Sequence, residues 1–230
     1  MKTIIISLLT YISLCYACSD KPNKDTSGKT ASRLTQTKKI RPVSIDNGKI
    51  FTRNGKKYLY GGEDSTWHFD ITNSQLIDSQ YHYGIGRETF DALISPNYMS
   101  ITEADAIYPD SARFLLLEIN GDVRAYGIDL LTHHEIVNDV VGGQPVMAAY
   151  CLLADLGAIY DRIIDGQEYT FALSGYTYYD PDVWNGMDGF VFWDRETEST
   201  WWPLIGKAVS GTMINTPLKV LNEDNWSQTN

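Results

Sequence analysis

His134 and Cys151 are the two residues of this sequence whose chemistry best suits metal binding or nucleophilic catalysis. A thiolate and an imidazole held together bind a soft metal such as Cu(I) or Zn(II). An imidazole also lowers the pKa of a neighbouring thiol and makes it a better nucleophile. Glu135, Asn138 and Asp139 follow closely and offer groups that orient an imidazole or transfer protons. In the alternative interpretation, Cys151 is a small core residue and His134 hydrogen-bonds a backbone carbonyl at a turn.

A loop rich in oxygen donors is the second candidate site. Between residues 176 and 189 the chain carries Asp180, Asp182, Asn185 and Asp188. Carboxylate and amide oxygens are the ligands that Ca²⁺ prefers. Their spacing misses the alternate-residue pattern of an EF-hand loop, because Trp184 stands at the third ligand position. The segment therefore predicts either a weak calcium site or an ordinary polar turn.

Tryptophans are dense in the same part of the chain, at Trp184, Trp193, Trp201 and Trp202. Indole rings stack on sugar rings and on apolar ligands, so these four residues are candidates for ligand stacking. Aromatic residues are also common in β-strands, where they fill a core. The sequence leaves both roles open.

The first residues predict export. Residues 1–17 have Lys2 followed by a short apolar run and read as a signal peptide of the lipoprotein type. Ala17 stands directly before Cys18, which resembles a bacterial lipobox, so we expect cleavage there and lipidation of Cys18. Residues 18–43 are rich in Lys, Ser, Thr and Asn and form a flexible basic tether. The expected location is the cell envelope, lipid-anchored to a bacterial membrane; ordinary secretion and an uncleaved anchor are the alternatives.

The remaining residues, 44–230, are strongly acidic. They carry 11 of the 19 basic residues and 27 of the 29 acidic residues, a net charge of −16. Such a surface repels phosphate backbones, so we expect no nucleic-acid partner. Once the leader is cleaved and Cys18 is acylated, Cys151 is the single free thiol. An internal disulfide and a zinc site with several thiolates are therefore excluded.

Residues 44–230 predict a single domain that is mainly β (α+β). Antiparallel hairpins are expected to form a sandwich or a barrel-like sheet with a few short helices. Asn-Gly pairs predict tight type I′ turns. The expected hairpins join 49–53 to 56–60, 114–119 to 122–126, 157–164 to 168–173, and 189–193 to 199–202. Short helices are expected at 74–80, 87–94 and 102–107, the last with a capping box of Thr102 and Asp105.

Several sequence blocks between about residues 84 and 221 resemble those of domain of unknown function 3179, a family of exported bacterial and archaeal proteins. The matching blocks are 100–105, 118–126, 134–139, 141–146, Tyr150-Cys151, 193–197, 201–204 and Gly211. In the family the tyrosine is usually followed by Cys-Pro-Leu-Cys-Gly, whereas this chain has Cys151-Leu152-Leu153-Ala154-Asp155. Because the second thiol is missing, a paired-cysteine site does not carry over to this protein.

Together these features predict a lipid-anchored binding module for a metal, a small ligand or an envelope protein. Its partners would be a membrane, reached through the lipid, and a small ligand or protein that the sequence does not identify. An enzyme that uses His134 with Cys151, or a carboxylate such as Glu135, is the first alternative. A structural envelope protein is the second.

Overall fold

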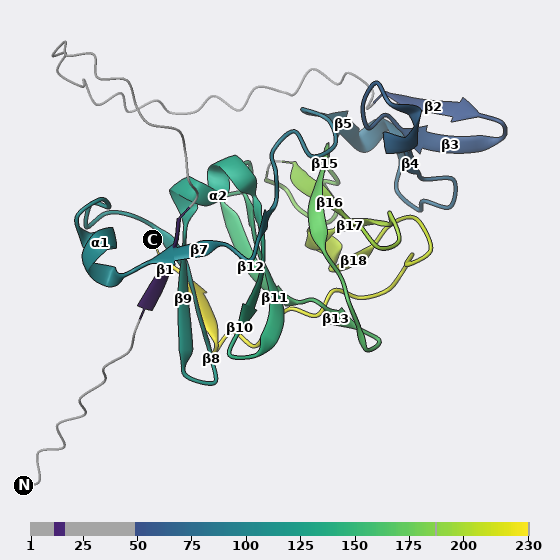
Figure 1. Ribbon diagram of the computed structural model, residues 1–230. Coiled ribbons are helices and arrows are strands. Elements are labelled where there is room, and N and C mark those ends of the chain that lie inside the picture. Colours follow the sequence, from purple (N-terminus) through teal and green to yellow (C-terminus); the bar gives the residue numbers. More distant parts are fainter. Residues whose placement is uncertain (1–11, 17–48, 187, 230) are drawn as a thin grey trace, which may run out of the picture.

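The computed structural model describes residues 12–16, 49–186 and 188–229 (Figure 1). The described chain is mainly β, with antiparallel hairpins and a few short helices, as the sequence predicts, and its sheets do not close into a barrel. Two sheets have five strands, one has four, one has three and one has two. The helices are α1 (Ile101–Asp105) and α2 (Ile128–His134), with 3₁₀ turns at Ser65–Trp67, Asp78–Gln80 and Pro203–Ile205.

Three of these sheets contain most of the strands. The first runs in the order β19 (Trp226–Gln228), β8 (Phe114–Ile119), β9 (Asp122–Gly127), β1 (Ile12–Tyr16) and β7 (Asn97–Met99). The second runs β12 (Leu156–Asp161), β11 (Gln144–Cys151), β10 (Ile136–Val141) and β6 (Leu93–Ile94). The third runs β18 (Lys207–Ala208), β17 (Thr200–Trp202), β16 (Gly189–Asp194), β15 (Phe171–Tyr178) and β5 (Tyr81–Tyr83).

Two smaller sheets complete the described chain. One contains β2 (Ile50–Arg53), β3 (Lys56–Leu59) and β4 (Phe69–Asp70), and the other pairs β13 (Ile163–Ile164) with β14 (Gln167–Glu168). Two contacts between strands are parallel, β1 with β9 and β6 with β10; the other strand pairs are antiparallel.

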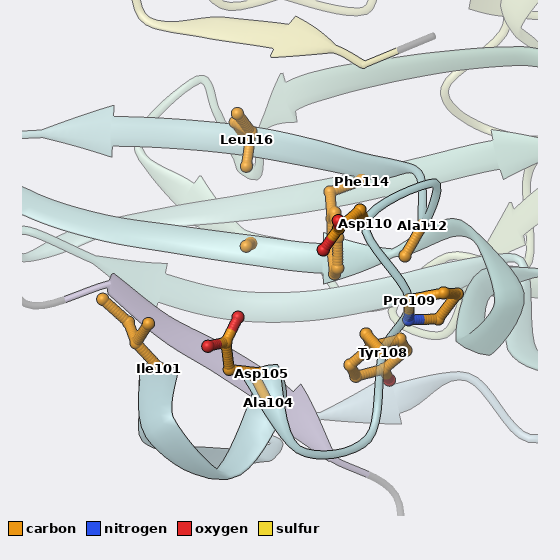
Figure 2. A pocket seen from close by; sticks show the side chains of 10 residues that line it. Ile101, Ala104, Asp105, Tyr108, Pro109, Asp110, Ala112, Phe114 and Leu116 are labelled. Atoms are coloured by element: carbon orange, nitrogen blue, oxygen red, sulfur yellow. The ribbon is translucent and has the colours of Figure 1, made fainter.

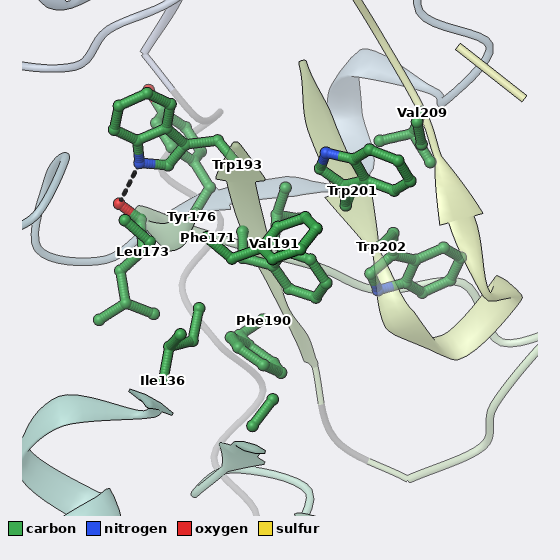
Figure 3. Packing of buried hydrophobic residues seen from close by; sticks show 14 of the residues in the cluster. Ile136, Phe171, Leu173, Tyr176, Phe190, Val191, Trp193, Trp201, Trp202 and Val209 are labelled. Atoms are coloured by element: carbon green, nitrogen blue, oxygen red, sulfur yellow. Dashed lines mark hydrogen bonds between the residues drawn. The ribbon is translucent and has the colours of Figure 1, made fainter. Parts of the chain in front are cut away.

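The four-stranded sheet is the middle layer, and the alternation of side chains along β11 shows why. Val146, Ala148 and Tyr150 pack in one apolar core with residues of β8 and β9. Met147, Ala149 and Cys151 pack in the other core, with residues of β15 and β16. Because successive side chains of a strand point to opposite faces, β11 is buried on both sides. The second core is rich in aromatic rings (Figure 3).

Three of the four predicted hairpins are confirmed. Asn54-Gly55 and Asn120-Gly121 have positive φ at both turn residues and join β2 to β3 and β8 to β9. β16 also pairs with β17. The third hairpin is shorter than predicted: Asp165-Gly166 turns the chain between β13 and β14, while β12 and β15 lie in different sheets. The chain changes sheets at Arg162, whose buried guanidinium donates to the carbonyls of Val146 and Tyr169.

Two of the predicted helices are wrong over most of their length. Within 74–80 only the 3₁₀ turn at Asp78–Gln80 is found, and 87–94 forms turns followed by β6. At 87–94 the backbone amides of Arg87 and Glu88 donate to Gly61 and Leu173 instead of a helix, and Glu88 has a φ of 49°. The third prediction is confirmed as α1, although its capping box consists of Ser100 and Glu103.

Candidate functional site

An apolar cavity of about 270 Å³ lies where the end of α2 and the turn after β11 meet β15 and β16. Its walls are made mainly by Ile85, Phe90, Leu153, Leu173 and Phe190. Three lining residues have polar side-chain groups, Glu135, Tyr176 and Thr177, and Glu135 is the one among them that is ionisable near neutral pH. A small pocket of this kind, with few polar groups among apolar walls, is typical of a site for a small organic ligand.

The backbone of Glu135 is fixed on both sides. Glu135 ends α2 in the left-handed conformation, with φ 54°, and its amide donates to the carbonyl of Leu131 at 2.7 Å. Its own carbonyl accepts a hydrogen bond of 2.8 Å from the amide of Tyr150 on β11. The side chain of Glu135 therefore starts from a fixed backbone position, where the end of α2 meets β11.

Glu135 is a buried residue, and no described residue pairs with its carboxyl. The residue is 9% exposed, and among the described residues its carboxyl has no hydrogen-bond donor and no counter-ion. Burial in an apolar environment disfavours the charged form and raises the pKa of Glu135 to about 7. Close to neutral pH this carboxyl therefore exchanges between its protonated and charged forms.

A buried polar cluster lies behind Thr177. The Thr177 hydroxyl donates to the Asp188 carboxylate at 2.7 Å, and Nδ1 of His82 hydrogen-bonds the same oxygen. The carboxylate thus stands between the hydroxyl and the imidazole. In a Ser-His-Asp arrangement the imidazole occupies the middle position and removes the proton of the hydroxyl. This order therefore does not activate Thr177 as a nucleophile, and the cluster links β5 and β15 to the residue that precedes β16.

The structure gives Cys151 and His134 separate partners. Cys151 is 4% exposed, its thiol donates to the carbonyl of Asp188 at 3.8 Å, and burial raises its pKa. His134 is partly exposed, and its Nδ1 lies 2.7 Å from the carbonyl of Asp91. These are the contacts of the alternative interpretation, in which Cys151 is a core residue and His134 hydrogen-bonds a backbone carbonyl. Within the described residues no three His, Cys, Asp or Glu side chains gather as a metal site.

The four oxygen donors of the predicted calcium loop diverge. Asp180 accepts from the amide of Asp182 at 2.9 Å, and Asn185 is exposed. Asp188 is instead buried, at 6% exposure, with Thr177 and His82. The four side chains therefore do not surround one ion in this structure, and the loop has the local contacts of a polar turn.

Three of the four candidate tryptophans belong to the aromatic core. Trp193, Trp201 and Trp202 are at most 3% exposed, so their ring faces are not open to a sugar (Figure 3). The indole of Trp193 donates to the carbonyl of Leu173 at 3.0 Å. Trp184, at 36% exposure, is the member of the set that can contact a ligand.

Sequence reasoning named Glu135 only as a minor candidate and missed His82 and Thr177. His82 lies between Tyr81 and Tyr83 on β5, and an alternating pattern would predict it to be exposed, whereas Tyr81 and His82 are both buried. Cys18, the predicted lipidation site, lies outside the described residues. Residues 12–16 of the predicted leader form strand β1.

Among the described residues no helix has the length and apolar character needed to cross a membrane.

Comparison with known proteins gives one match. Neither the curated proteins nor the solved structures contain a significant match to the chain. The model of the protein family of unknown function DUF3179 matches residues 87–228, close to the range predicted from the sequence blocks. The chain belongs to the DUF3179 family.

Proposed function

We propose that this protein is a lipid-anchored binding module of the bacterial cell envelope that holds a small apolar amine beside Glu135. The observation that carries the proposal is Glu135, a buried residue that lines an apolar cavity and whose carboxyl has no counter-ion among the described residues. A buried carboxylate is costly unless it is paired. An ammonium group on a ligand would supply that partner, while the apolar part of the ligand fills the cavity.

The size and charge of the domain agree with such a ligand. A cavity of about 270 Å³ accommodates an aromatic ring or a short alkyl chain. The net charge of −16 on residues 44–230 attracts cations and repels anions. Both features favour a small organic cation over a carboxylate or a phosphate ester.

The membrane anchor is inferred from the first residues of the sequence. Lipidation of Cys18 would hold the domain at the membrane, because each buried methylene of an acyl chain contributes about 0.8 kcal/mol. Residues 19–43 would then separate the domain from the lipid surface. Mass spectrometry of the native protein tests this part: the proposal expects an acylated Cys18 at the amino end, and a retained Met1 would overturn it.

Calorimetric titration with benzylamine, benzyl alcohol and benzoate at pH 8 tests the ligand class. We expect benzylamine to bind, benzyl alcohol to bind more weakly and benzoate not to bind. Glu135→Gln should weaken benzylamine binding at least about tenfold, since it removes the ion pair while keeping the shape of the side chain. Glu118→Gln is the matched control, because Glu118 is exposed on β8 and should leave binding unchanged. Equal binding of benzylamine by the wild type and Glu135→Gln would refute the proposal.

The second candidate function is an enzyme in which Glu135 transfers protons. A general acid or base works best when its pKa lies close to the pH of operation, and the pKa of Glu135 is about 7. An enzyme would convert the bound amine, whereas a binding module releases it unchanged. Mass spectrometry of benzylamine recovered after long incubation separates the two.

A further inference from the structure

Strand β1 fills a gap between two strands of the first sheet. It runs antiparallel to β7, with Leu14 opposite Met99 and Cys15 opposite Tyr98. It runs parallel to β9, with Leu14 also opposite Ala125. In the described sheets β7 pairs with no other strand. β1 therefore occupies a groove that is one strand wide and has hydrogen-bonding backbone on both sides.

Contacts that do not involve β1 hold the two walls of this groove. The Tyr98 hydroxyl of β7 donates to the carboxylate of Asp139, and the Arg124 guanidinium of β9 lies 4.5 Å from the centre of the Tyr98 ring. Met99 of β7 also packs with Ala125 of β9 and Ala104 of α1 in a small apolar cluster. The groove should therefore keep its width when β1 leaves.

β1 lies wholly within residues 1–17, the part of the chain that the proposed export would remove. Its loss would expose the backbone groups of β7 and of one edge of β9. Unpaired strand edges bind extended segments of other chains. This step rests on the cleavage of the leader that is part of the proposed function.

We propose that the β7–β9 groove of the processed protein binds an extended segment of an envelope protein in place of β1. The present occupant, Ile12–Tyr16, indicates what fits: about five residues in extended conformation, without charge. The guest backbone would pair with both walls, parallel to β9 and antiparallel to β7.

A second cavity beside β1 adds a preference for side chains of the guest (Figure 2). It measures about 270 Å³ and is lined by apolar groups of Ile101, Tyr108 and Phe114. The side chains of Asp105 and Asp110 reach into the same space between α1 and the sheet (Figure 2). A basic residue close to the uncharged segment would therefore strengthen binding.

Fluorescence anisotropy with a labelled peptide tests the groove in the full chain. The peptide carries the sequence of residues 10–17, with serine in place of Cys15 and a lysine added at its carboxyl end. In the Leu14→Pro variant we expect β1 to leave the groove, because proline lacks the amide that pairs with a neighbouring strand. This variant should bind the peptide at least about tenfold more tightly than the wild type, whose groove is filled. Leu8→Pro, outside β1, should behave like the wild type.

Two further measurements test whether the peptide binds by strand pairing in the groove and whether Asp105 and Asp110 contact its lysine. A peptide with proline at the position of Leu14 should not bind the Leu14→Pro variant. The double variant Asp105→Asn, Asp110→Asn, in the Leu14→Pro background, should weaken binding of the lysine peptide but leave a peptide without the lysine unchanged.

The proposal is overturned if folded Leu14→Pro protein, checked by circular dichroism, fails to bind the peptide. It is also overturned if light scattering shows that this variant dimerises and the dimer excludes the peptide, since a second copy would then be the occupant. Failure of the export proposal gives a different signature, a retained Met1 in the native protein, and leaves peptide binding by the variant intact.

Discussion

The backbone amide of Tyr150 donates a hydrogen bond of 2.8 Å to the carbonyl of Glu135. This bond places the end of α2 against the end of β11, so that Glu135 and Cys151 share the same apolar surroundings. The charge of Glu135 is one of the causes that raise the pKa of Cys151, after burial. Two acidic groups are thus brought into a region that favours their neutral forms.

Glu135 should make the stability of the fold depend on pH. Its pKa is about 7 in the folded protein and close to 4.5 in the unfolded chain, so the folded state binds more protons between these values. The free energy of unfolding should therefore fall as pH rises from about 4.5 to 7, by an amount on the order of 3 kcal/mol. Glu135→Gln should abolish this fall and be more stable than the wild type at pH 8. Urea unfolding at several pH values measures the effect, and an unchanged slope in Glu135→Gln would contradict it.

Cys151 should be unreactive in the folded protein. It is buried and its raised pKa leaves little thiolate at neutral pH. In a Cys15→Ser, Cys18→Ser background, where Cys151 is the remaining thiol, iodoacetamide at pH 7.5 should modify it at least about 100-fold more slowly than in urea. Equal rates in both conditions would show that the thiol is accessible.

Asp194 should be essential to the turn between β16 and β17. This buried carboxylate accepts from the amide of Thr197 at 2.6 Å and from the indole of Trp201 at 2.8 Å. Asp194→Ala leaves both donors without an acceptor and should lower the free energy of unfolding by about 3 kcal/mol or more. Asp182→Ala, at an exposed loop position, should change it by less than about 0.5 kcal/mol. Similar losses in both variants, measured by urea unfolding, would contradict this role.

Gly175 should tolerate no side chain, because it lies at the wall of the Glu135 cavity against the backbone. Its φ is +78°, and a Cβ there would stand 2.0 Å from the carbonyl oxygen of Gly86. Gly166→Ala is the matched control: φ is +81° and nothing lies within 4 Å of the added Cβ. The control should cost about 1 to 2 kcal/mol, the penalty of the left-handed conformation alone. Gly175→Ala should cost clearly more in thermal unfolding, and equal costs would show that the loop at Gly86 moves away freely.

The parts of this fold that can be predicted from the sequence are those determined by neighbouring residues, such as the tight turns of the hairpins. Asn54-Gly55 and Asn120-Gly121 carry the positive φ angles that their turns require, so both hairpins could be placed from the sequence. Residues 87–94 have a helical pattern, but their backbone groups pair with Gly61 and Leu173. The sequence of 87–94 contains no sign of hydrogen bonds to residues so distant in the chain. The local pattern therefore predicts a helix that does not form.

The surroundings of the candidate site also depend on residues that are distant in the sequence. Glu135 gains its raised pKa from apolar residues of distant segments, such as Phe90, Leu173 and Phe190, which the fold brings to one cavity. The sequence groups Asp188 with the calcium loop because it is close to Asp182 in the chain, although its partners His82 and Thr177 lie on β5 and β15. Residue types identified the candidates, but only the packing of the sheets distinguishes a buried carboxyl from a solvated one.

The pH titration of the Glu135 side-chain carboxyl, followed by carbon NMR with and without benzylamine, shows directly whether this carboxyl pairs with an amine. We predict a pKa of about 7 in the free protein, and a clearly lower pKa when benzylamine is bound, because the ammonium group stabilises the charged form. A carboxyl that titrates near its ordinary value of 4.5 and does not respond to the amine would show that Glu135 does not bind a cationic ligand.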